Sequence, residues 1–535
     1  MRAPVAGLAG HGSGPAQEAA GPGCIFPARA LRIVLVTCAL AAGLAIRVWV
    51  LSSHLGEVDQ DEAVTGLMAR HVLDGEFSVF FWGQAYGGSQ EAVVTAALFA
   101  LFGSGALTLK LVPLALYGLA TWLVWRVGRR SVGEPAATLG ALLFWLGPTF
   151  FVLRSTRAYG FYGTAMVVSL AFVLVVLRLR ERNSRMGAVT LGLLLGVGWW
   201  TTPQIVFVAV PATIWLVVRA PGMLRQAPLM AAAAVMGASP WLIWNITHHW
   251  MSLDTEIFAG VGDNSYADHL RGFFNPLLPM ALGLRVPYSR AWILERPLAL
   301  GIYGALLAAF AFAAVRRWRR AEPLLVVALA YPFLYSLSPA AFYLLEPRYL
   351  FLLSPVIALL LALALGGPRR PRSGVTGASA QVMGVAAVAV LCVTGLRQIN
   401  VPNPVTAPSS LAPLLAALDG HGVDRLYTPY VIAHRISFDS DERIAASPSE
   451  YIRHPPLELT VRARPTPAYL FVRGSPLQIQ FEAGLGRLEV AAEKTAVGTF
   501  DLYLPSARVL PEDWWNEARG LPFIEKAAGV PGRRR

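Results

Sequence analysis

The sequence predicts an α-helical membrane protein with many spans and a small α/β domain near its C-terminus. Hydrophobic residues make up 55% of the 535 residues, and charged residues only 14%. Soluble domains carry about 25% charged residues, so much of this surface is expected to face lipid. The second observation is a series of long apolar runs separated by arginine-rich segments, and the third is a less apolar region after residue 396.

The charge pattern argues against a nucleic-acid partner. Net charge is +13, and Lys110, Lys494 and Lys526 are the only lysines among the 45 basic residues. The arginines gather in short runs between apolar stretches, which is typical of the cytoplasmic loops of membrane proteins. The three cysteines show no spacing of a disulfide framework or a metal site. The sequence therefore signals no metal ion and no other cofactor.

Residues 1–28 are rich in Gly, Ala and Pro, and we expect them to form a disordered cytoplasmic tail. Residues 29–396 form the predicted transmembrane region. A membrane-crossing helix needs about 20 apolar residues, and this region holds about eleven such stretches. The predicted spans are 31–53, 107–128, 136–153, 161–178, 187–201, 203–218, 228–246, 298–315, 322–338, 349–366 and 379–396.

Arginines follow every second span and predict the orientation. They are Arg126, Arg129, Arg130, Arg178, Arg180, Arg182, Arg185, Arg219, Arg225, Arg316, Arg317, Arg319, Arg320, Arg369, Arg370 and Arg372. Such loops lie on the cytoplasmic side, so the N-terminus is expected there. An odd number of spans then places the C-terminal domain outside. The sequence predicts a multi-pass protein of the cytoplasmic (inner) membrane.

Residues 397–510 are predicted to form a small extracytoplasmic α/β domain. Prolines at 402, 404 and 408 indicate a linker, and a short helix is expected at 411–418. Alternating or continuous apolar runs predict strands. These strands are 425–431, 468–472, 488–491 and 499–504. Residues 511–535 are expected to form a loosely attached tail.

The first outer loop, 54–106, is unusually acidic. Its acidic residues are Glu57, Asp59, Asp61, Glu62, Asp74, Glu76 and Glu91. Asp59 and Glu62 are spaced as the N-cap and third residue of a helix over 60–73, close to a capping box. Asp61 has two interpretations. It interacts favourably with the helix dipole, or it acts as a general base that positions an acceptor nucleophile.

The second half of that loop mixes aromatic rings with glycines and amides. Trp82, Tyr86, Gln90 and Glu91 lie just before or within an apolar stretch over 90–102. That stretch is short for a span and is typical of a helix lying in the membrane interface. The aromatic residues are either interfacial anchors or, with Gln90 and Glu91, a site for a sugar ring.

Three arginines next to predicted spans lie on the expected outer side, against the general trend: Arg154 and Arg157 in the short loop after the third span, and Arg348 at the start of the tenth. An arginine near the membrane needs a partner. Carboxylates in facing loops are one class of partner. A lipid phosphate, which a guanidinium group binds through two hydrogen bonds, is the other. We favour the phosphate for Arg157 and Arg348.

These residues resemble the GT-C superfamily of membrane glycosyltransferases, in particular the bacterial branch similar to protein O-mannosyltransferases and the lipid A aminoarabinose transferase. The resemblance covers roughly residues 31–366. It rests on Asp61-Glu62 at the start of the first-loop helix and on the interfacial stretch ending at Gly103. Arg157-Ala158-Tyr159 and Pro347-Arg348-Tyr349 also fit the family.

The resemblance implies that a sugar passes from a polyprenyl phosphate carrier to an acceptor outside the cytoplasmic membrane, with inversion at the anomeric carbon. Asp61 would be the catalytic carboxylate, and Glu62 would support it or cap the helix. Arg157 and Arg348 would hold the carrier phosphate, with Tyr159 and Tyr349 beside them. The acceptor, a protein, lipid or polysaccharide of the cell envelope, stays open.

One departure from the family concerns the second outer loop. It has Arg154 and Arg157 but no acidic residue, whereas some relatives place a carboxylate there. This difference puts any metal-assisted version of the reaction in doubt. The alternatives to a transferase are a transporter or flippase of lipid-linked saccharides, and a ligase of whole glycans. A transporter would carry ionisable residues near the middle of its spans, whereas here the charges gather at the span ends.

Overall fold

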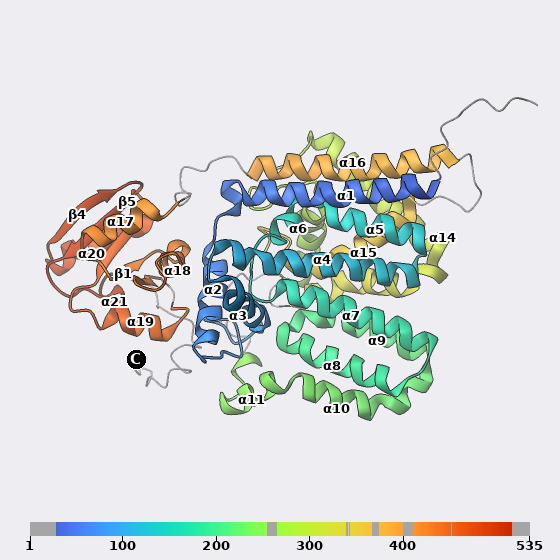
Figure 1. The fold of residues 1–535 in the computed structure, drawn as a ribbon, viewed down its shortest axis with the longest axis horizontal. Helices are drawn as coiled ribbons and strands as arrows, with labels where there is room; N and C mark the ends of the chain where they lie inside the picture. Colours follow the sequence, from blue (N-terminus) through green and yellow to red (C-terminus); the bar gives the residue numbers. More distant parts are fainter. Residues whose placement is uncertain are drawn as a thin grey trace, which may run out of the picture.

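A computed structural model of the protein describes residues 28–253, 265–338, 341, 343–365, 374–399, 410–450 and 452–515. Nearly all of the predicted N-terminal tail, the proline linker and most of the predicted C-terminal tail lie outside these ranges, as do Arg369, Arg370 and Arg372. The described chain forms a helical bundle with a sheet-containing unit at one end, and helices α2 and α3 lie between the two (Figure 1).

The first half of the chain is helical. Its helices are α1 (Ala28–Leu51), α2 (Gln60–Leu73), α3 (Gln90–Phe102), α4 (Ala106–Ser131), α5 (Glu134–Leu146), α6 (Thr149–Arg154), α7 (Tyr162–Glu181), α8 (Arg185–Thr201) and α9 (Val206–Arg219). The predicted first-loop helix over 60–73 and the interfacial helix over 90–102 are confirmed. Gly103 ends α3 with a φ of 83°, a conformation that residues with a Cβ rarely adopt.

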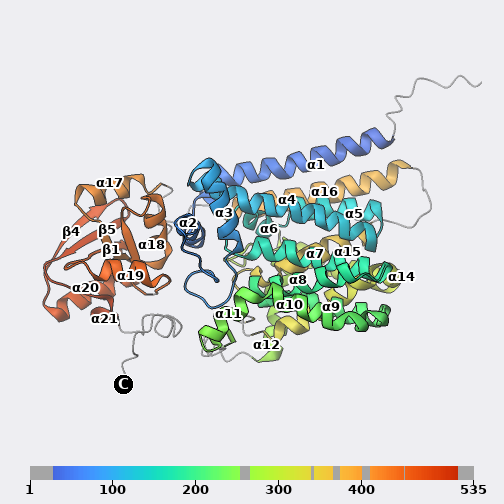
Figure 2. The ribbon, with the colours of Figure 1, turned by 60° about the horizontal axis from the view of Figure 1, so that its bottom comes forward.

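The helices of the second half complete the bundle (Figure 2). They are α10 (Ala227–Gly237), α11 (Ser239–Thr247), α12 (Tyr266–Gly272), α13 (Leu278–Ala281), α14 (Arg296–Ser336), α15 (Ser354–Leu365) and α16 (Gly374–Ile399). Short 3₁₀ or π turns connect several of them. These turns are His54–Gly56, Pro203–Ile205, Pro221–Gln226, Met251–Leu253, Phe273–Leu277 and Arg348–Leu353.

Among the described residues, six helices are long and apolar enough to cross a membrane, and one bent pair at 116° would raise the number to seven. This agrees with a multi-pass membrane protein but does not confirm eleven spans. The predicted span 136–153 is interrupted at Gly147 and Pro148, between α5 and α6. The predicted span 298–315 and all but the last two residues of the span 322–338 lie within α14, which stays helical across the arginines between them.

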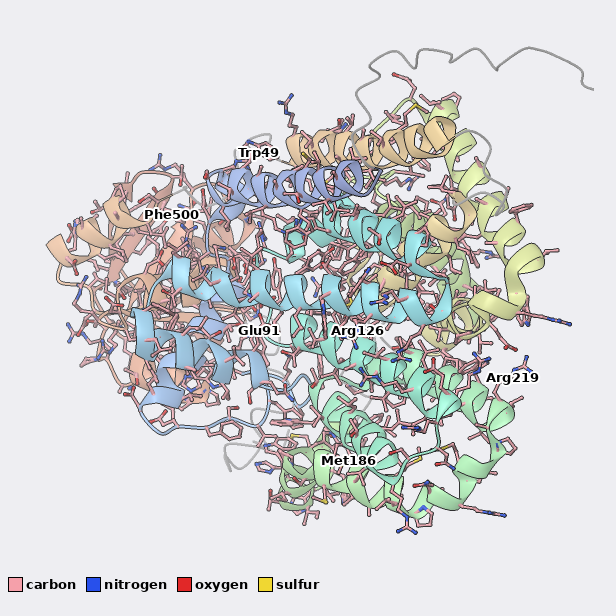
Figure 3. The ribbon with its side chains drawn as sticks, turned by 45° about the vertical axis from the view of Figure 1, so that its right-hand side comes forward. Trp49, Glu91, Arg126, Met186, Arg219 and Phe500 are labelled. Atoms are coloured by element: carbon pink, nitrogen blue, oxygen red, sulfur yellow. The ribbon has the colours of Figure 1, made fainter. Side chains whose placement is uncertain are left out.

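The arginine-rich helix ends lie together. Arg130 pairs with Glu181 at 2.5 Å, and the Nε of Arg219 donates to Glu322 at 3.0 Å. Figure 3 shows Arg219 at the end of the bundle remote from Phe500, which belongs to the sheet-containing unit. The bundle is therefore asymmetric in charge, with an arginine-rich end opposite the C-terminal unit.

The C-terminal unit, residues 410–515, is built on a five-stranded sheet in the order β2-β1-β3-β5-β4. Its strands are β1 (Arg425–Thr428), β2 (Ala445–Pro448), β3 (Ala468–Val472), β4 (Ala492–Val497) and β5 (Phe500–Pro505). The first three run parallel, while β5 is antiparallel to β3 and β4. Its helices are α17 (Ala412–Gly420), α18 (Tyr430–Asp439), α19 (Pro455–Arg462), α20 (Pro476–Leu488) and α21 (Pro511–Trp514).

The predicted strands at 468–472 and 499–504 and the start of the strand at 425–431 are confirmed. The strand predicted at 488–491 is wrong, because α20 continues to Leu488 and Glu489 ends it in a left-handed conformation. Neither edge strand is among the predicted strands: the Ala-Ala-Ser-Pro sequence of β2 has little β propensity, and β4 begins just after the strand expected at 488–491. Packing also continues past residue 510, since Trp514 is buried against Phe481 at a ring distance of 5.2 Å.

Candidate active site

The site begins at the first turn of α2. The Asp59 Oδ1 accepts hydrogen bonds from the backbone N–H groups of Asp61 and Glu62, both at 3.0 Å. The Glu62 carboxylate accepts one in return from the Asp59 N–H at 3.3 Å. The predicted capping box is therefore confirmed. It fixes where the helix starts and turns the three acidic side chains in different directions.

Glu62 is fully buried and joins three segments. Both of its oxygens accept hydrogen bonds from the Lys110 ammonium group at 2.8 Å. Its Oε1 also accepts one from the backbone N–H of Ala158 at 3.1 Å. Because a buried charge is stable only when it is paired and hydrogen-bonded, this arrangement ties α2 to α4 and to the loop that carries Arg157.

Asp59 uses its second oxygen to hold that loop. The Asp59 Oδ2 accepts hydrogen bonds from the Arg157 guanidinium at 2.9 Å and from the Tyr159 hydroxyl at 2.5 Å. Burial alone would raise the pKa of Asp59, but Arg157 and the Tyr159 hydroxyl hold it below its ordinary value of 3.8. Asp59 is therefore ionised, and the sequence-predicted Arg157 and Tyr159 lie together.

A second carboxylate, Glu346, joins the other two arginines. The fully buried Glu346 pairs with Arg154 and, at 2.5 Å, with Arg348, and it accepts a hydrogen bond from the Tyr288 hydroxyl at 2.5 Å. Burial opposes ionisation, but Arg154 and Arg348 hold the pKa of Glu346 below its ordinary value. The Arg154 guanidinium also stacks on the Tyr159 ring at 3.6 Å. All three outer arginines thus have carboxylate partners.

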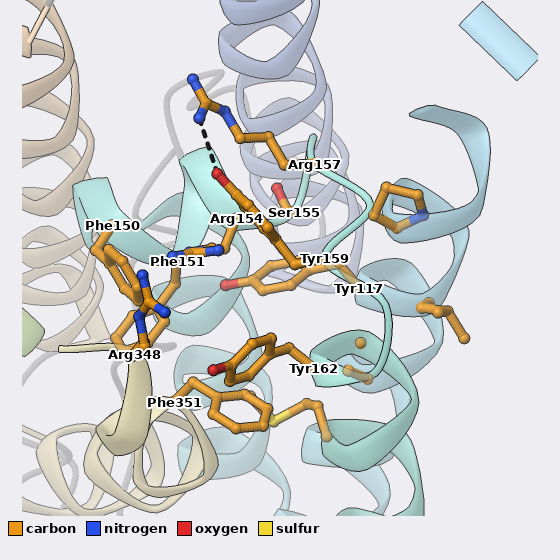
Figure 4. A pocket seen from close by; sticks show the side chains of 15 residues that line it. Tyr117, Phe150, Phe151, Arg154, Ser155, Arg157, Tyr159, Tyr162, Arg348 and Phe351 are labelled. Carbon is orange, nitrogen blue, oxygen red and sulfur yellow. Dashed lines mark hydrogen bonds between the residues drawn. The ribbon is translucent and has the colours of Figure 1, made fainter. Parts of the chain in front are cut away.

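Between these two clusters lies a cavity of about 540 Å³ including its mouth. Arg154, Arg157 and Arg348 line it from one side, and aromatic rings line most of the rest (Figure 4). Those rings are Tyr117, Phe150, Phe151, Tyr159, Tyr162 and Phe351. The structure therefore brings Arg157 and Arg348 to one cavity. Tyr349 is not among its lining residues, although the chain turns there beside Arg348.

The Asp61 side chain points toward the C-terminal unit. Its Oδ1 accepts hydrogen bonds from the Tyr430 hydroxyl at 2.9 Å and from the Arg453 guanidinium at 3.1 Å. Both donors belong to the C-terminal unit. Its Oδ2 accepts no hydrogen bond from any described residue, and 27% of the side chain is exposed. Asp61 lies only two residues after Asp59, but its side chain contacts the C-terminal unit and does not touch an outer arginine of the bundle.

The predicted sugar-site residues of the first outer loop lie in different environments. Trp82 is buried and stacks on His454 at 3.7 Å, so one face of its ring is covered. Tyr86 meets the Phe161 ring edge-on at 6.4 Å. By contrast, the side-chain oxygens of Glu91 and the amide of Gln90 are buried without a hydrogen-bond partner among the described residues.

Glu91 lies close to the cavity. A Cβ atom added to Gly163, a lining residue, would be 3.6 Å from the Glu91 Oε2. Burial, with Glu62 nearby, raises the pKa of Glu91 to about 8, so this carboxyl group is mostly protonated at neutral pH. A buried carboxyl group with no partner is a rare arrangement that a ligand hydroxyl would satisfy.

Several site residues were missed in the sequence. Arg47 is fully buried within the first span, where it donates to the Ser155 hydroxyl at 2.8 Å and lies over the Trp145 ring at 3.8 Å. An arginine inside a span is itself a signal of a functional site, so Arg47 was detectable. The partners from distant segments, Tyr430 and Arg453, carry no such signal. Among the described residues, no three His, Cys, Asp or Glu side chains are grouped to hold a metal ion.

Residues 92–244 match the model of a family described as dolichyl-phosphate-mannose-protein mannosyltransferase. The fold is similar to crystal structures of ArnT from Cupriavidus metallidurans, bound to undecaprenyl phosphate and in the apo state. Each gives 14% identity and a TM-score of 0.58, covering 89% of this chain and 98% of that chain. The oligosaccharyltransferase AglB from Archaeoglobus fulgidus gives 12% identity and a TM-score of 0.48, covering 91% and 77%. No curated protein matches.

The predicted resemblance to the GT-C superfamily is confirmed. The chain shares the fold of ArnT over nearly the whole length of that protein. The partial family match and the shared fold together agree with a membrane glycosyltransferase.

Glu62→Gln tests the buried Glu62–Lys110 pair. The change removes the charge that compensates Lys110, so we expect the free energy of unfolding to fall by about 3–5 kcal/mol. Thermal unfolding of the purified protein in detergent measures the loss. Glu134→Gln, at a half-exposed carboxylate, is the control and should leave the midpoint almost unchanged. Equal midpoints for the wild type and Glu62→Gln would contradict a stabilising role of the pair.

Glu91→Gln tests the buried, protonated carboxyl group. Between its ordinary value of 4.5 and about 8, the folded protein keeps the Glu91 proton while the unfolded chain releases it. The contribution of this group to stability is therefore complete below 4.5 and is lost as pH rises through about 8. Compared with Glu91→Gln, the wild type should lose unfolding free energy over this range. Parallel pH dependence of the two proteins would show that Glu91 is ionised in the fold.

Proposed function

We propose that this protein transfers a sugar from a polyprenyl-phosphate-linked donor to an acceptor at the outer face of the cytoplasmic membrane. The observation that carries the proposal is the cavity at one end of the bundle. It combines three guanidinium groups with an aromatic lining, and one of these groups, Arg157, is held by Asp59, the N-cap of the helix that presents Asp61. A lipid phosphate and its sugar need this combination of positive charge and apolar walls.

The donor phosphate would bind at Arg157 and Arg348, with Arg154 beside them. The three guanidinium groups face only two carboxylates, Asp59 and Glu346, so the cluster keeps an excess positive charge. The Nε of Arg157 is buried without a hydrogen-bond acceptor among the described residues, which leaves it for a phosphate oxygen. ArnT, whose fold this chain shares, has been crystallised with undecaprenyl phosphate bound, which supports a lipid phosphate as a ligand of this chain.

Asp61 would be the catalytic carboxylate. Its Oδ2 would take the proton of the acceptor hydroxyl while the acceptor oxygen bonds to the anomeric carbon. The bond from that carbon to the phosphate oxygen breaks, and the electron pair leaves with the carrier phosphate. The arginines stabilise the resulting charge. Glu62 takes no part in proton transfer here, because its oxygens are held by Lys110 and Ala158; it supports Asp61 by capping α2.

Sugar hydroxyls would bind Gln90 and Glu91, whose polar atoms lack partners among the described residues. A protonated Glu91 donates one hydrogen bond and accepts another, which suits a hydroxyl group. Tyr86 would contact the sugar ring. Trp82 would shape the site through its stack with His454, and Tyr159 would hold Arg157 in place.

The orientation follows from the charge distribution. The arginine-rich helix ends lie opposite the C-terminal unit (Figure 3), and such ends favour the cytoplasm. The cavity, α2 and the C-terminal unit would then lie at the outer face. A flippase is less well supported, because the outer cluster of charges is built at one membrane face. A ligase would not require the acidic helix α2.

Asp61→Asn is the test of this function. The variant should lose transfer by on the order of a hundredfold or more, because the proton acceptor is removed, while undecaprenyl phosphate binding stays unchanged. Transfer is measured with detergent-purified full-length protein, radiolabelled undecaprenyl phosphate mannose or other hexoses and pentoses, and envelopes from a strain lacking the gene. Transfer in detergent also distinguishes a transferase from a flippase.

Asp74→Asn provides the matched control, since Asp74 is an exposed carboxylate at the other end of α2. It should transfer sugar at the rate of the wild type. Full activity of Asp61→Asn would exclude Asp61 as the catalytic carboxylate. Absence of transfer by the wild type from every donor tested, together with movement of the lipid-linked sugar across a vesicle membrane, would favour the flippase.

A further inference from the structure

The C-terminal unit touches the proposed catalytic carboxylate directly. Tyr430, at the start of α18, and Arg453, just before α19, both donate to the Oδ1 of Asp61. We propose that Arg453 and Tyr430 are positioning residues of the active site, which is complete only when the C-terminal unit is docked on α2. This inference rests on the proposed role of Asp61.

Arg453 packs closely against the first outer loop. Its guanidinium group lies over the rings of Phe81 and Tyr430, 5.0 and 5.2 Å from their centroids. A Cβ atom on Gly83 would stand 2.8 Å from the Arg453 Cα and 3.0 Å from its carbonyl oxygen. Gly83 also has a φ of 74°, so a larger residue would be strained there and would displace Arg453.

The rest of the interface fixes the C-terminal unit on both sides of Asp61. Before it, Arg435 pairs with Glu57 at 3.3 Å. After it, Phe438 packs on Gly66, where an added Cβ would be only 2.4 Å from the Phe438 ring. One turn later, Arg70 donates to the Phe438 carbonyl oxygen at 3.0 Å. Contacts at successive turns of one helix hold α18 at a single position along α2.

Further along α2, His71 continues this contact. Its Nε2 lies 3.1 Å from the Glu442 carboxylate. The hydrogen bond to Glu442, together with Glu76, raises the pKa of His71 to about 9, so His71 is a cation at neutral pH. His454, stacked on Trp82, has its pKa lowered to about 3 by burial and by His71, so it is neutral. The interface thus alternates charged pairs with neutral packed rings.

The two donors have a direct chemical consequence. They occupy one carboxylate oxygen and fix the plane of the group, so that Oδ2 is the oxygen left for the acceptor hydroxyl. Holding a catalytic group in one orientation speeds the reaction, because misplacing it by about 1 Å can lower the rate on the order of a hundredfold. The C-terminal unit would therefore act on the catalytic step and not on donor binding, which depends on the arginines of the bundle.

The test compares two arginines of the same interface. Arg453→Gln removes the donor to Asp61, whereas Arg435→Gln breaks the Glu57 pair; the two side chains are 10% and 9% exposed. With undecaprenyl phosphate mannose, or another labelled donor that supports transfer by the wild type, Arg453→Gln should lower kcat by about 10- to 100-fold. Its KM for the donor and its affinity for undecaprenyl phosphate should not change. Arg435→Gln weakens the docking of the C-terminal unit but leaves both donors to Asp61 in place, so it should lower kcat clearly less than Arg453→Gln.

Two further variants keep the test decisive if Arg453→Gln folds poorly. Tyr430→Phe removes only a hydroxyl group and should lower kcat by about 3- to 30-fold, and Arg453→Lys should recover part of the activity. Equal losses for Arg453→Gln and Arg435→Gln, or a loss confined to donor KM, would overturn the positioning role. If Asp61→Asn is inactive in the same assay, the proposed function stands even when the positioning role of Arg453 and Tyr430 is overturned. If Asp61→Asn is active, the proposed role of Asp61 and the positioning role are both excluded.

Discussion

The buried Glu62–Lys110 pair is the constraint on which the site depends. Glu62 caps α2, neutralises a lysine of α4 and holds the backbone of the loop after α6. A charge of this kind cannot shift without losing its partners. Because α2 is fixed in this way, Asp59 must face Arg157 and Asp61 must face the C-terminal unit. Three neighbouring carboxylates thereby acquire three separate tasks: anchoring, arginine placement and proposed catalysis.

The arginine cluster shows how positive charge is kept at a membrane boundary before a ligand arrives. Glu346 pairs with two guanidinium groups and Asp59 with the third, while aromatic rings cover the faces of Arg154 and Arg348. Such pairing prevents the cost of isolated buried charges. An arriving phosphate supplies the negative charge that the cluster lacks. The cluster is thus stable in its absence and favourable to an anion in its presence.

The sequence predicted local features well and distant contacts poorly. The Asp59–Glu62 spacing predicts the start of α2, and the apolar run at 90–102 predicts α3, because helix caps and periodicity are local signals. Which carboxylate meets which arginine depends on the loop at 155–161, so only the structure shows that Arg157 contacts Asp59. Arg453 lies far from α2 in sequence, and no local pattern connects it to Asp61.

A structure of the full-length protein with undecaprenyl phosphate tests the central claim most directly, because it locates the carrier phosphate. The account predicts a phosphate within about 3 Å of the Arg157 and Arg348 guanidinium groups, with the lipid chain along the aromatic wall and Asp61 still held by Arg453. A phosphate bound at the arginine-rich end of the bundle, near Arg219, would contradict it. So would a cavity that stays empty at saturating lipid.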